Sequence, residues 1–136
     1  SARYQGEGWG LCSDGEQLIM SDGTATLTGR DPKTFAAKWT MQVTRKGAPV
    51  PYLNELEYIE GRIYANVFEE DIVLVIHPKT GVVEAVIDFA PLVASVQKQD
   101  RSSGVLNGLA WDAKRGLLLV TGKTWNRLFA VKLGKP

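Results

Sequence analysis

The sequence has very little of what several classes of protein require. It contains one cysteine, Cys12, and one histidine, His77, among 136 residues. A disulfide within the chain is therefore impossible, and a cysteine-based zinc site or a Ser-His or Cys-His catalytic pair is disfavoured. No apolar run approaches the roughly 20 residues that a membrane helix needs. We therefore expect no metal, no membrane span and no histidine-dependent nucleophile.

Charge of one sign is also scarce. The net charge is +1 and the basic residues are scattered, so neither a nucleic acid nor an anionic membrane is an expected partner. The longest block of like charge, 69–71, reads as a solvated loop. The Gly-rich stretch GEGWG does not follow a strand and open a helix, as a phosphate-binding loop would. No cofactor is predicted.

The start of the chain, SARYQGEGWG, has neither an initiator Met nor the apolar core of a signal peptide. A mature form, a processed product and an excised piece are all compatible with it. The apolar content of 44% and charged content of 23% are those of a soluble domain, and the length suits one domain spanning 1–136.

A threefold repeat runs through the chain. Three segments align on a leucine, and each has a short strand, a turn and an apolar strand: WGLCSDGEQLIMSDG, NELEYIEGRIYANVF and NGLAWDAKRGLLLVTGK. A third alternating strand follows each segment, and a fourth follows the first two. The repeats cover about 6–46, 53–90 and 105–134, and the third stops after three strands. Residues 90–104 separate the last two repeats, with a short helix predicted first and a polar loop after it.

Short strands repeated at intervals of 45 and 53 residues favour an all-β fold, a β-propeller with about three four-stranded blades. A β-sandwich explains the number of strands but not the phased repeat. Propellers close with about four to eight blades, so three blades form only part of a ring. Either a second polypeptide supplies the missing blades, or the chain belongs to a longer protein.

Several polar and aromatic side chains fall at equivalent positions of the repeats. Trp9, Asn54 and Asn107 stand at the start of the first strand, and other residues stand where the second strand ends. Because neighbouring antiparallel strands start and end at the same rim, we expect one mouth lined by Trp9, Asp22, Asn54, Phe68, Asn107, Lys123 and Trp125.

Each of these residues also has a purely structural explanation. The asparagines and the Asp22-Gly23 pair are typical of turns. Trp9 could pack within a blade, and Lys123 could be an ordinary surface lysine. His77 aligns with Asp31 in a Pro-Lys-Thr turn and is predicted to be a turn residue.

The stretches GEGWGL, MSDGT, LNELEYIEGRIYANV, VLNGLAWD and VTGKTW resemble the plant and bacterial type of glutaminyl cyclase. They occur in that family's order and nearly span the chain. The resemblance implies a five-bladed propeller that works without zinc, of which this chain covers about three blades. It also implies the family reaction, in which an N-terminal glutamine of a peptide or protein closes to pyroglutamate and releases ammonia.

The resemblance implies roles for individual residues. Asn54 and Lys123 would be catalytic, as a hydrogen-bond partner of the substrate and as a donor or tuning charge, and Glu7 is a further catalytic candidate. Substrate-binding roles would fall to Trp9, Phe68, Asn107, Asp22 and Trp125. The family usually has Trp where this chain has Phe68, so an indole N–H donor is lost.

One catalytic element of the family is missing from these 136 residues. The family's acid/base glutamate lies in a stretch like Phe-Thr-Glu-Gly-Leu, which does not occur here. The chain alone is therefore expected to have little or no activity. The alternative is a non-catalytic propeller module that binds a peptide or a protein partner. The family is usually exported, which implies a periplasmic or secreted location.

Overall fold

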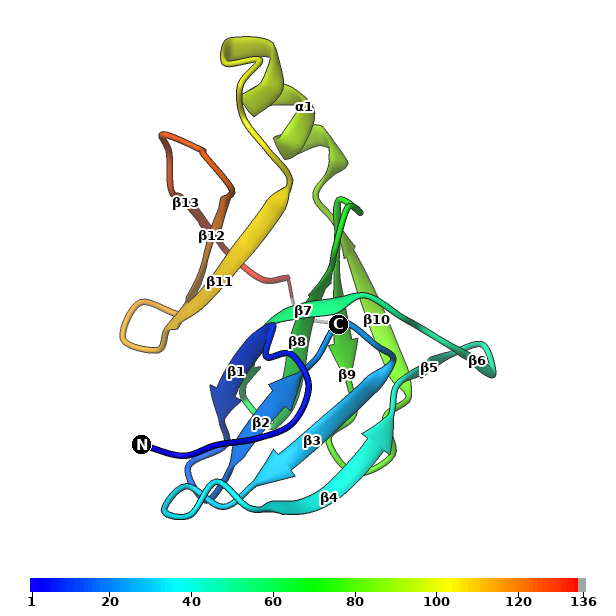
Figure 1. The fold of residues 1–136 in the computed structure, drawn as a ribbon. Helices are drawn as coiled ribbons and strands as arrows, with labels where there is room; N and C mark the ends of the chain where they lie inside the picture. The colour runs from blue at the N-terminus through cyan, green and yellow to red at the C-terminus, as the bar shows by residue number, and fades with distance from the viewer. Residues whose placement is uncertain (135–136) are drawn as a thin grey trace.

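Antiparallel strands are the main secondary structure of residues 1–134, the part of the chain that the computed structural model describes (Figure 1). The first sheet has the order β1-β2-β3-β4, with strands at Gly10–Ser13, Leu18–Ser21, Thr26–Arg30 and Ala37–Gln42. The second has the order β7-β8-β9-β10, with strands at Leu53–Ile59, Arg62–Val67, Ile72–Ile76 and Val83–Asp88. The third is β11-β12-β13, at Leu106–Asp112, Leu117–Gly122 and Phe129–Val131. The predicted all-β class is confirmed.

Two elements lie outside these sheets. A two-stranded hairpin, β5 (Thr44–Arg45) and β6 (Ala48–Pro49), joins the first sheet to the second and was not predicted. The helix α1 (Ala90–Gln99) lies in the segment where a short helix was expected. Asp88 accepts a hydrogen bond from the N–H of Ala90, and a proline in the first turn suits the start of a helix. None of the helices among residues 1–134 has the length and apolar character to cross a membrane.

The hairpins form at the predicted turns. Ile59 pairs with Arg62 across β7 and β8, so Glu60 and Gly61 alone make the connection. Both have positive φ, 45° and 83°, as a tight two-residue hairpin turn requires. Asp31 and His77 occupy matching turns, each accepting a hydrogen bond from the backbone N–H two residues later. His77 is therefore a turn residue, as predicted.

The three sheets are arranged like blades around an axis. Their first strands, β1, β7 and β11, lie side by side, with β7 between the other two. Each sheet then runs outward from this centre through its later strands (Figure 1). The starts of the three first strands therefore meet at one rim.

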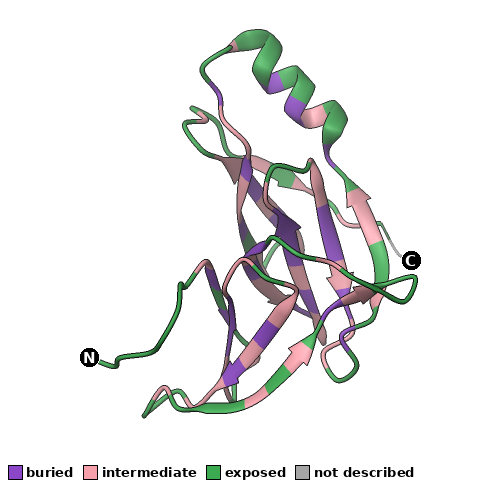
Figure 2. Cartoon of the chain, turned by 45° about the vertical axis from the view of Figure 1, so that its right-hand side comes forward, coloured by how far each residue is buried: buried purple, intermediate pink, exposed green. Residues whose placement is uncertain are grey.

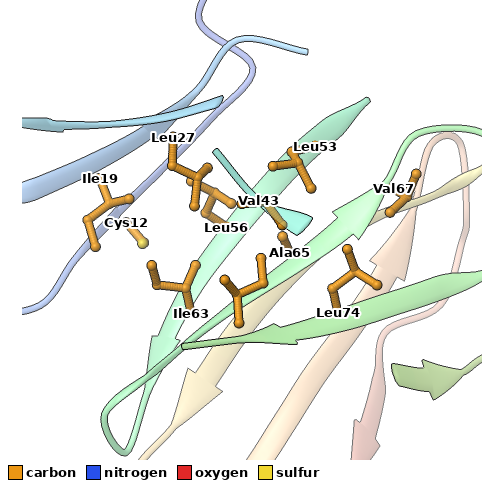
Figure 3. Close-up of a cluster of buried hydrophobic side chains, with 11 residues drawn as sticks. Cys12, Ile19, Leu27, Val43, Leu53, Leu56, Ile63, Ala65, Val67 and Leu74 are labelled. Carbon is orange, nitrogen blue, oxygen red and sulfur yellow. The ribbon is translucent and has the colours of Figure 1, made fainter. Parts of the chain in front are cut away.

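Apolar side chains fill the spaces between the sheets. One cluster lies between the first and second sheets and includes Ile19, Leu27, Leu56, Ile63 and Leu74, all at most 1% exposed (Figure 3). A second cluster joins the second sheet, the third sheet and α1. Figure 2 shows many of the buried residues on the strands of the sheets, whereas the first residues of the chain are exposed.

Buried polar groups bind neighbouring sheets together. Ser21, at the end of β2, donates from Oγ to the carbonyl oxygen of Asn54 at 2.6 Å. Asn66 holds the same repeat position in β8, and its Nδ2 donates to the carbonyl oxygen of Leu106 at 2.8 Å. Its Oδ1 accepts the N–H of Glu55 at 2.8 Å. Because both side chains are fully buried, these bonds fix the relative positions of the first strands.

Candidate functional site

Three predicted site residues, one from each repeat, contact each other in a chain. The ring of Trp9 meets that of Phe68 edge-on, with centroids 5.6 Å apart and an interplanar angle of 79°. The ammonium group of Lys123 lies over the same Phe68 ring, 5.2 Å from its centroid. Trp9 precedes β1, Phe68 follows β8 and Lys123 follows β12. The structure thus brings together at one rim residues that are far apart in the sequence.

Glu7 joins this group through Trp9. The indole Nε1 donates a hydrogen bond to the carboxylate of Glu7 at 2.7 Å. Both a bonded carboxylate and a T-shaped aromatic contact restrict the orientation of the indole. Glu7 in this arrangement supports the Trp9 wall.

Gly23 provides the surface against which Trp9 packs. A Cβ atom at this position would lie 2.6 Å from two atoms of the indole ring, closer than any side chain tolerates. Gly23 also has a φ of +83°, which favours glycine. The Asp22-Gly23 turn therefore has a packing role that its sequence, typical of any turn, does not reveal.

Tyr52 links the loops on either side of the aromatic pair. Its N–H donates to the carbonyl of Gly23 at 2.9 Å, and its carbonyl accepts the N–H of Phe68 at 2.8 Å. Tyr52 has a φ of +64°, which is strained for a bulky residue. These two bonds tie the loop that precedes β7 to Gly23, against which Trp9 packs, and to the backbone of Phe68.

Asn54, near the start of β7, is a further candidate for binding a ligand. It is 6% exposed, and its backbone carbonyl accepts the Ser21 bond. Its carboxamide makes none of the side-chain hydrogen bonds found within residues 1–134, although buried polar groups are usually paired. Asn107, at the equivalent position of the third repeat, is half-buried and also lacks a side-chain bond within those residues.

A β-bulge sets the orientation of both asparagines. The register between β7 and β8 shifts between Leu53 and Leu56, and the register between β11 and β12 shifts between Leu106 and Leu109. Bulges redirect side chains and are frequent beside active sites. The two irregularities fall on Asn54 and Asn107.

Two other predicted residues are occupied by structural contacts. The carboxylate of Asp22 accepts bonds from the N–H and hydroxyl of Thr24, at 3.0 and 2.6 Å. The Trp125 indole donates to the carbonyl of Gly104 at 2.8 Å and packs edge-on against Phe129. Neither is part of the Trp9–Phe68–Lys123 contacts, so the structure gives them supporting positions at the rim.

An acidic face lies beside the mouth. Glu55 and Glu57 alternate with the buried Leu56 on β7. Burial and then the nearby Glu57 carboxylate raise the pKa of Glu55, and burial raises the pKa of Glu57. Glu55 also borders a cleft of about 460 Å³, whose other lining residues are Tyr4, Gly8, Trp9, Gly10, Leu11, Met20 and Phe35.

The described residues hold no cluster of metal-binding side chains. Within 1–134 no group of three or more His, Cys, Asp or Glu residues is arranged to hold a metal ion. The side chains at the mouth offer an ammonium group, a carboxamide, a carboxylate and aromatic walls. Such a set can hold a polar amide group between hydrogen-bond donors and flat apolar surfaces.

Comparison with known proteins identifies the family. The family model described as glutamine cyclotransferase matches residues 1–133. The chain belongs to the glutamine cyclotransferase family. A glutaminyl-peptide cyclotransferase from Arabidopsis thaliana is 43% identical over 128 residues. The crystal structure of Myxococcus xanthus glutaminyl cyclase is 45% identical, with a TM-score of 0.91 over 96% of this chain.

This member of the glutamine cyclotransferase family is short beside those relatives. It spans 40% of the length of the Arabidopsis protein and 57% of the Myxococcus chain. Hsv2 from Kluyveromyces lactis, only 9% identical with a TM-score of 0.63, shares the fold alone. The predicted family and the predicted propeller fold are thereby confirmed.

Sequence reasoning missed several residues that build this site. Ser21, Asn66, Tyr52 and Thr124 support the mouth through hydrogen bonds to distant segments. The repeat alignment gives Ser21 and Asn66 the same position in their blades. A polar residue at this position in both repeats was the available signal for a shared structural role. Nothing in the local sequence marks Tyr52 or Thr124.

Proposed function

We propose that this chain forms the substrate-binding part of a glutaminyl-peptide cyclotransferase, which acts on peptides or proteins with an N-terminal glutamine. The observation that carries the proposal is the contact of Trp9, Phe68 and Lys123, one residue from each repeat, at one rim. Family membership and the similarity to the Arabidopsis and Myxococcus proteins support the same reaction.

The reaction needs the glutamine side chain to fold back on its own amine. The α-amine nitrogen forms a bond to the γ-carboxamide carbon, and the bond from that carbon to the amide nitrogen breaks, releasing ammonia. Holding the two ends together converts the step into a favoured intramolecular one. The flat walls of Trp9 and Phe68 suit this task because they confine a compact five-membered ring.

Charge develops on the former amide oxygen during the attack. Lys123 is a charged donor at the mouth, and Asn54 offers an amide N–H and an oxygen acceptor. In this proposal Lys123 stabilises the oxyanion, and Asn54 binds the substrate amine or amide. One proton must also pass from the attacking amine to the leaving ammonia.

None of the residues at this mouth is assigned that proton transfer. The Glu7 carboxylate already accepts the Trp9 indole bond, and the Phe-Thr-Glu-Gly-Leu type of stretch is absent from the sequence. We therefore assign proton transfer to a carboxylate supplied by the missing blades, from the same polypeptide or from a second one. The 136 residues alone then bind substrate with little turnover.

Calorimetric titration with a short peptide that starts with glutamine tests the binding part. The Nα-acetylated peptide is the matched control, because it keeps the side chain but loses the free amine. Saturable binding of the first peptide and not of the second supports the proposal. Equal binding of both contradicts it, and favours instead a module that binds peptides without regard to their terminus.

Release of ammonia from the same peptide tests the catalytic part. We expect little release by the chain alone, and restored release when the remaining blades are supplied. Fast release by the purified 136-residue chain would overturn the assignment of the proton-transfer group to the missing blades. The second candidate function is a non-catalytic binding module, which the absence of the acid/base stretch favours. Failure of the remaining blades to restore ammonia release would support this alternative.

A further inference from the structure

Lys123 carries its charge on a long and flexible stem. A lysine side chain can adopt many rotamers, so an ammonium group at a defined place needs a well-fixed backbone beneath it. Lys123 follows the last residue of β12 and lies outside the regular ladder. Its position depends on the segment that connects α1 to β11.

That segment, Ser102–Val105, holds Lys123 from both sides. The Lys123 N–H donates to the carbonyl of Val105 at 2.9 Å, and the Lys123 carbonyl accepts the N–H of Gly104 at 2.8 Å. The Thr124 hydroxyl has two carbonyl acceptors within reach, that of Ser102 at 2.8 Å and that of Lys123 at 2.6 Å, and its single proton is donated to one of them at a time. The same hydroxyl oxygen accepts the N–H of Gly104 at 3.1 Å. We call Ser102–Val105 together with Thr124 the lysine clamp.

Thr124 is strained in a way that the clamp explains. Its φ is +60°, which is a rare and strained conformation for a β-branched residue. Such strain persists where the surroundings impose it, and it is frequent at functional sites. Glu69, which follows Phe68, has a φ of +66°. Both partners of the Lys123–Phe68 contact are thus followed by a residue in the left-handed region.

Close packing adds a second restraint. A Cβ atom at Gly104 would lie 3.0 Å from the carbonyl oxygen of Lys123 and 3.2 Å from its Cβ. A side chain at this position would press against Lys123, which would have to shift by a few tenths of an ångström. The Trp125 indole, bonded to the Gly104 carbonyl, fixes the other side of Gly104.

We propose that the lysine clamp is a positioning device, in which the Thr124 hydroxyl and Gly104 hold the Lys123 ammonium over the Phe68 ring. Thr124 acts through Lys123 and does not itself contact the substrate. The proposed placement of Lys123 does not depend on the proposed function. The use of Lys123 in binding an N-terminal glutamine does rest on it.

Nuclear magnetic resonance of the folded chain tests the placement directly. Protons near the face of an aromatic ring are shifted upfield, so the ε-CH₂ protons of Lys123 report the contact. Phe68→Leu gives the reference value without the ring. Thr124→Val, which keeps the shape and removes the hydroxyl, is expected to move the Lys123 signal to that reference. Thr124→Ser keeps the hydroxyl and is expected to retain the upfield shift.

Two further variants complete the test. Thr121→Val is the matched control, because the Thr121 hydroxyl bonds the carbonyl of Arg127 and not the clamp; the Lys123 shift is expected to persist. Gly104→Ala is expected to displace Lys123 even if Thr124→Val does not fold. An unchanged Lys123 signal in Thr124→Val, or in Gly104→Ala where that is the folded variant, overturns the proposal.

Binding of the glutaminyl peptide separates this inference from the proposed function. Thr124→Val is expected to weaken binding by the same factor as Lys123→Ala, and the double variant is expected to show no further loss. Additive losses would contradict a role through Lys123. If the unaltered chain does not bind the peptide, the proposed function fails, and the resonance experiment still decides whether the clamp places Lys123.

Discussion

The ammonium group of Lys123 lies 5.2 Å from the centre of the Phe68 ring, although the two residues follow strands of different sheets. Trp9, which precedes β1 in the first sheet, contacts the same ring edge-on. One aromatic ring therefore connects all three repeats at the mouth. Changes to this ring should alter ligand binding more than folding, because Phe68 belongs to neither buried core cluster.

Replacing Phe68 tests the importance of that ring for binding. Phe68→Leu removes the cation–π contact, which is worth about 0.5–1 kcal/mol at an exposed site and corresponds to a roughly two- to fivefold weaker affinity. Phe68→Trp keeps a flat wall and restores an indole N–H, so affinity is expected to be retained or improved. Calorimetric titration with the glutaminyl peptide measures both, and an affinity unaffected by Phe68→Leu would contradict the site.

The two asparagines near the outer ends of the β7–β8 hairpin, Asn54 and Asn66, should behave differently when replaced. Asn54→Ala removes a carboxamide that makes no bond within the described residues, so peptide binding should fall with little change in the free energy of unfolding. Asn66→Ala removes two bonds to buried backbone groups. It should lower the free energy of unfolding by about 1–3 kcal/mol for each buried group left unpaired. Urea denaturation and peptide titration of both variants check this contrast, and the opposite pattern would reverse the two roles.

The sequence analysis predicted the arrangement of blades and the equivalence of Trp9, Asn54 and Asn107, because a phased repeat carries both kinds of information. It gave Asn54 a role in the site and gave none to Asn66, whose bonds to a neighbouring sheet it did not predict. Their roles differ only in what lies opposite: the carbonyl of Leu106, forty positions away, faces Asn66. Contacts of this kind arise from the packing of one sheet on another, and no local pattern encodes them.

The same limit explains the missed clamp. The bonds from Thr124 to Ser102 and from Gly104 to Lys123 cross a whole hairpin. The positive φ of Thr124 is imposed by those bonds, against the preference of a β-branched residue. Trp125 was predicted to line the mouth, and the bond from its indole to the carbonyl of Gly104 in the clamp was not predicted.

The bond between Ser21 and Asn54 makes a prediction about stability. Ser21→Ala leaves the buried carbonyl of Asn54 without its donor, which should lower the free energy of unfolding by about 1–3 kcal/mol. Ser13→Ala is the matched control, because Ser13 bonds the carbonyl of Gln17 from an exposed position. Its effect should stay within roughly 0.5 kcal/mol. If urea denaturation shows an equal decrease in the free energy of unfolding for both variants, the inter-sheet bond contributes no more to stability than the exposed bond of Ser13.

Cys12 is expected to be chemically inert while the chain is folded. Burial, and then the carboxylates of Glu57, Asp14 and Glu55, raise the pKa of its thiol to about 12. The thiolate is the reactive form, so alkylation at neutral pH should be slow and should accelerate in urea. Mass spectrometry after timed treatment with iodoacetamide measures both rates. Rapid modification of the folded chain would contradict the buried position of Cys12 in the first core cluster.

The raised pKa of Glu55 predicts how stability changes with pH. The folded state holds the Glu55 proton more tightly than the unfolded state does, because burial and the neighbouring Glu57 disfavour its charged form. The contribution of this group to stability is therefore complete below its unfolded pKa, about 4.3. It is lost as the pH rises through the folded pKa.

Glu55→Gln removes the carboxylate and keeps the shape of the side chain. The variant should be more stable than the unaltered chain at pH 7, with the advantage disappearing as the pH falls below the unfolded pKa. Glu16→Gln, at an exposed turn, controls for the general effect of losing one negative charge. Urea denaturation of the three proteins across pH 4 to 8 measures the difference. The prediction is contradicted if Glu55→Gln is less stable than the unaltered chain at pH 7 and this deficit disappears at low pH. That result would show that the Glu55 carboxylate has a stabilising partner in the folded protein.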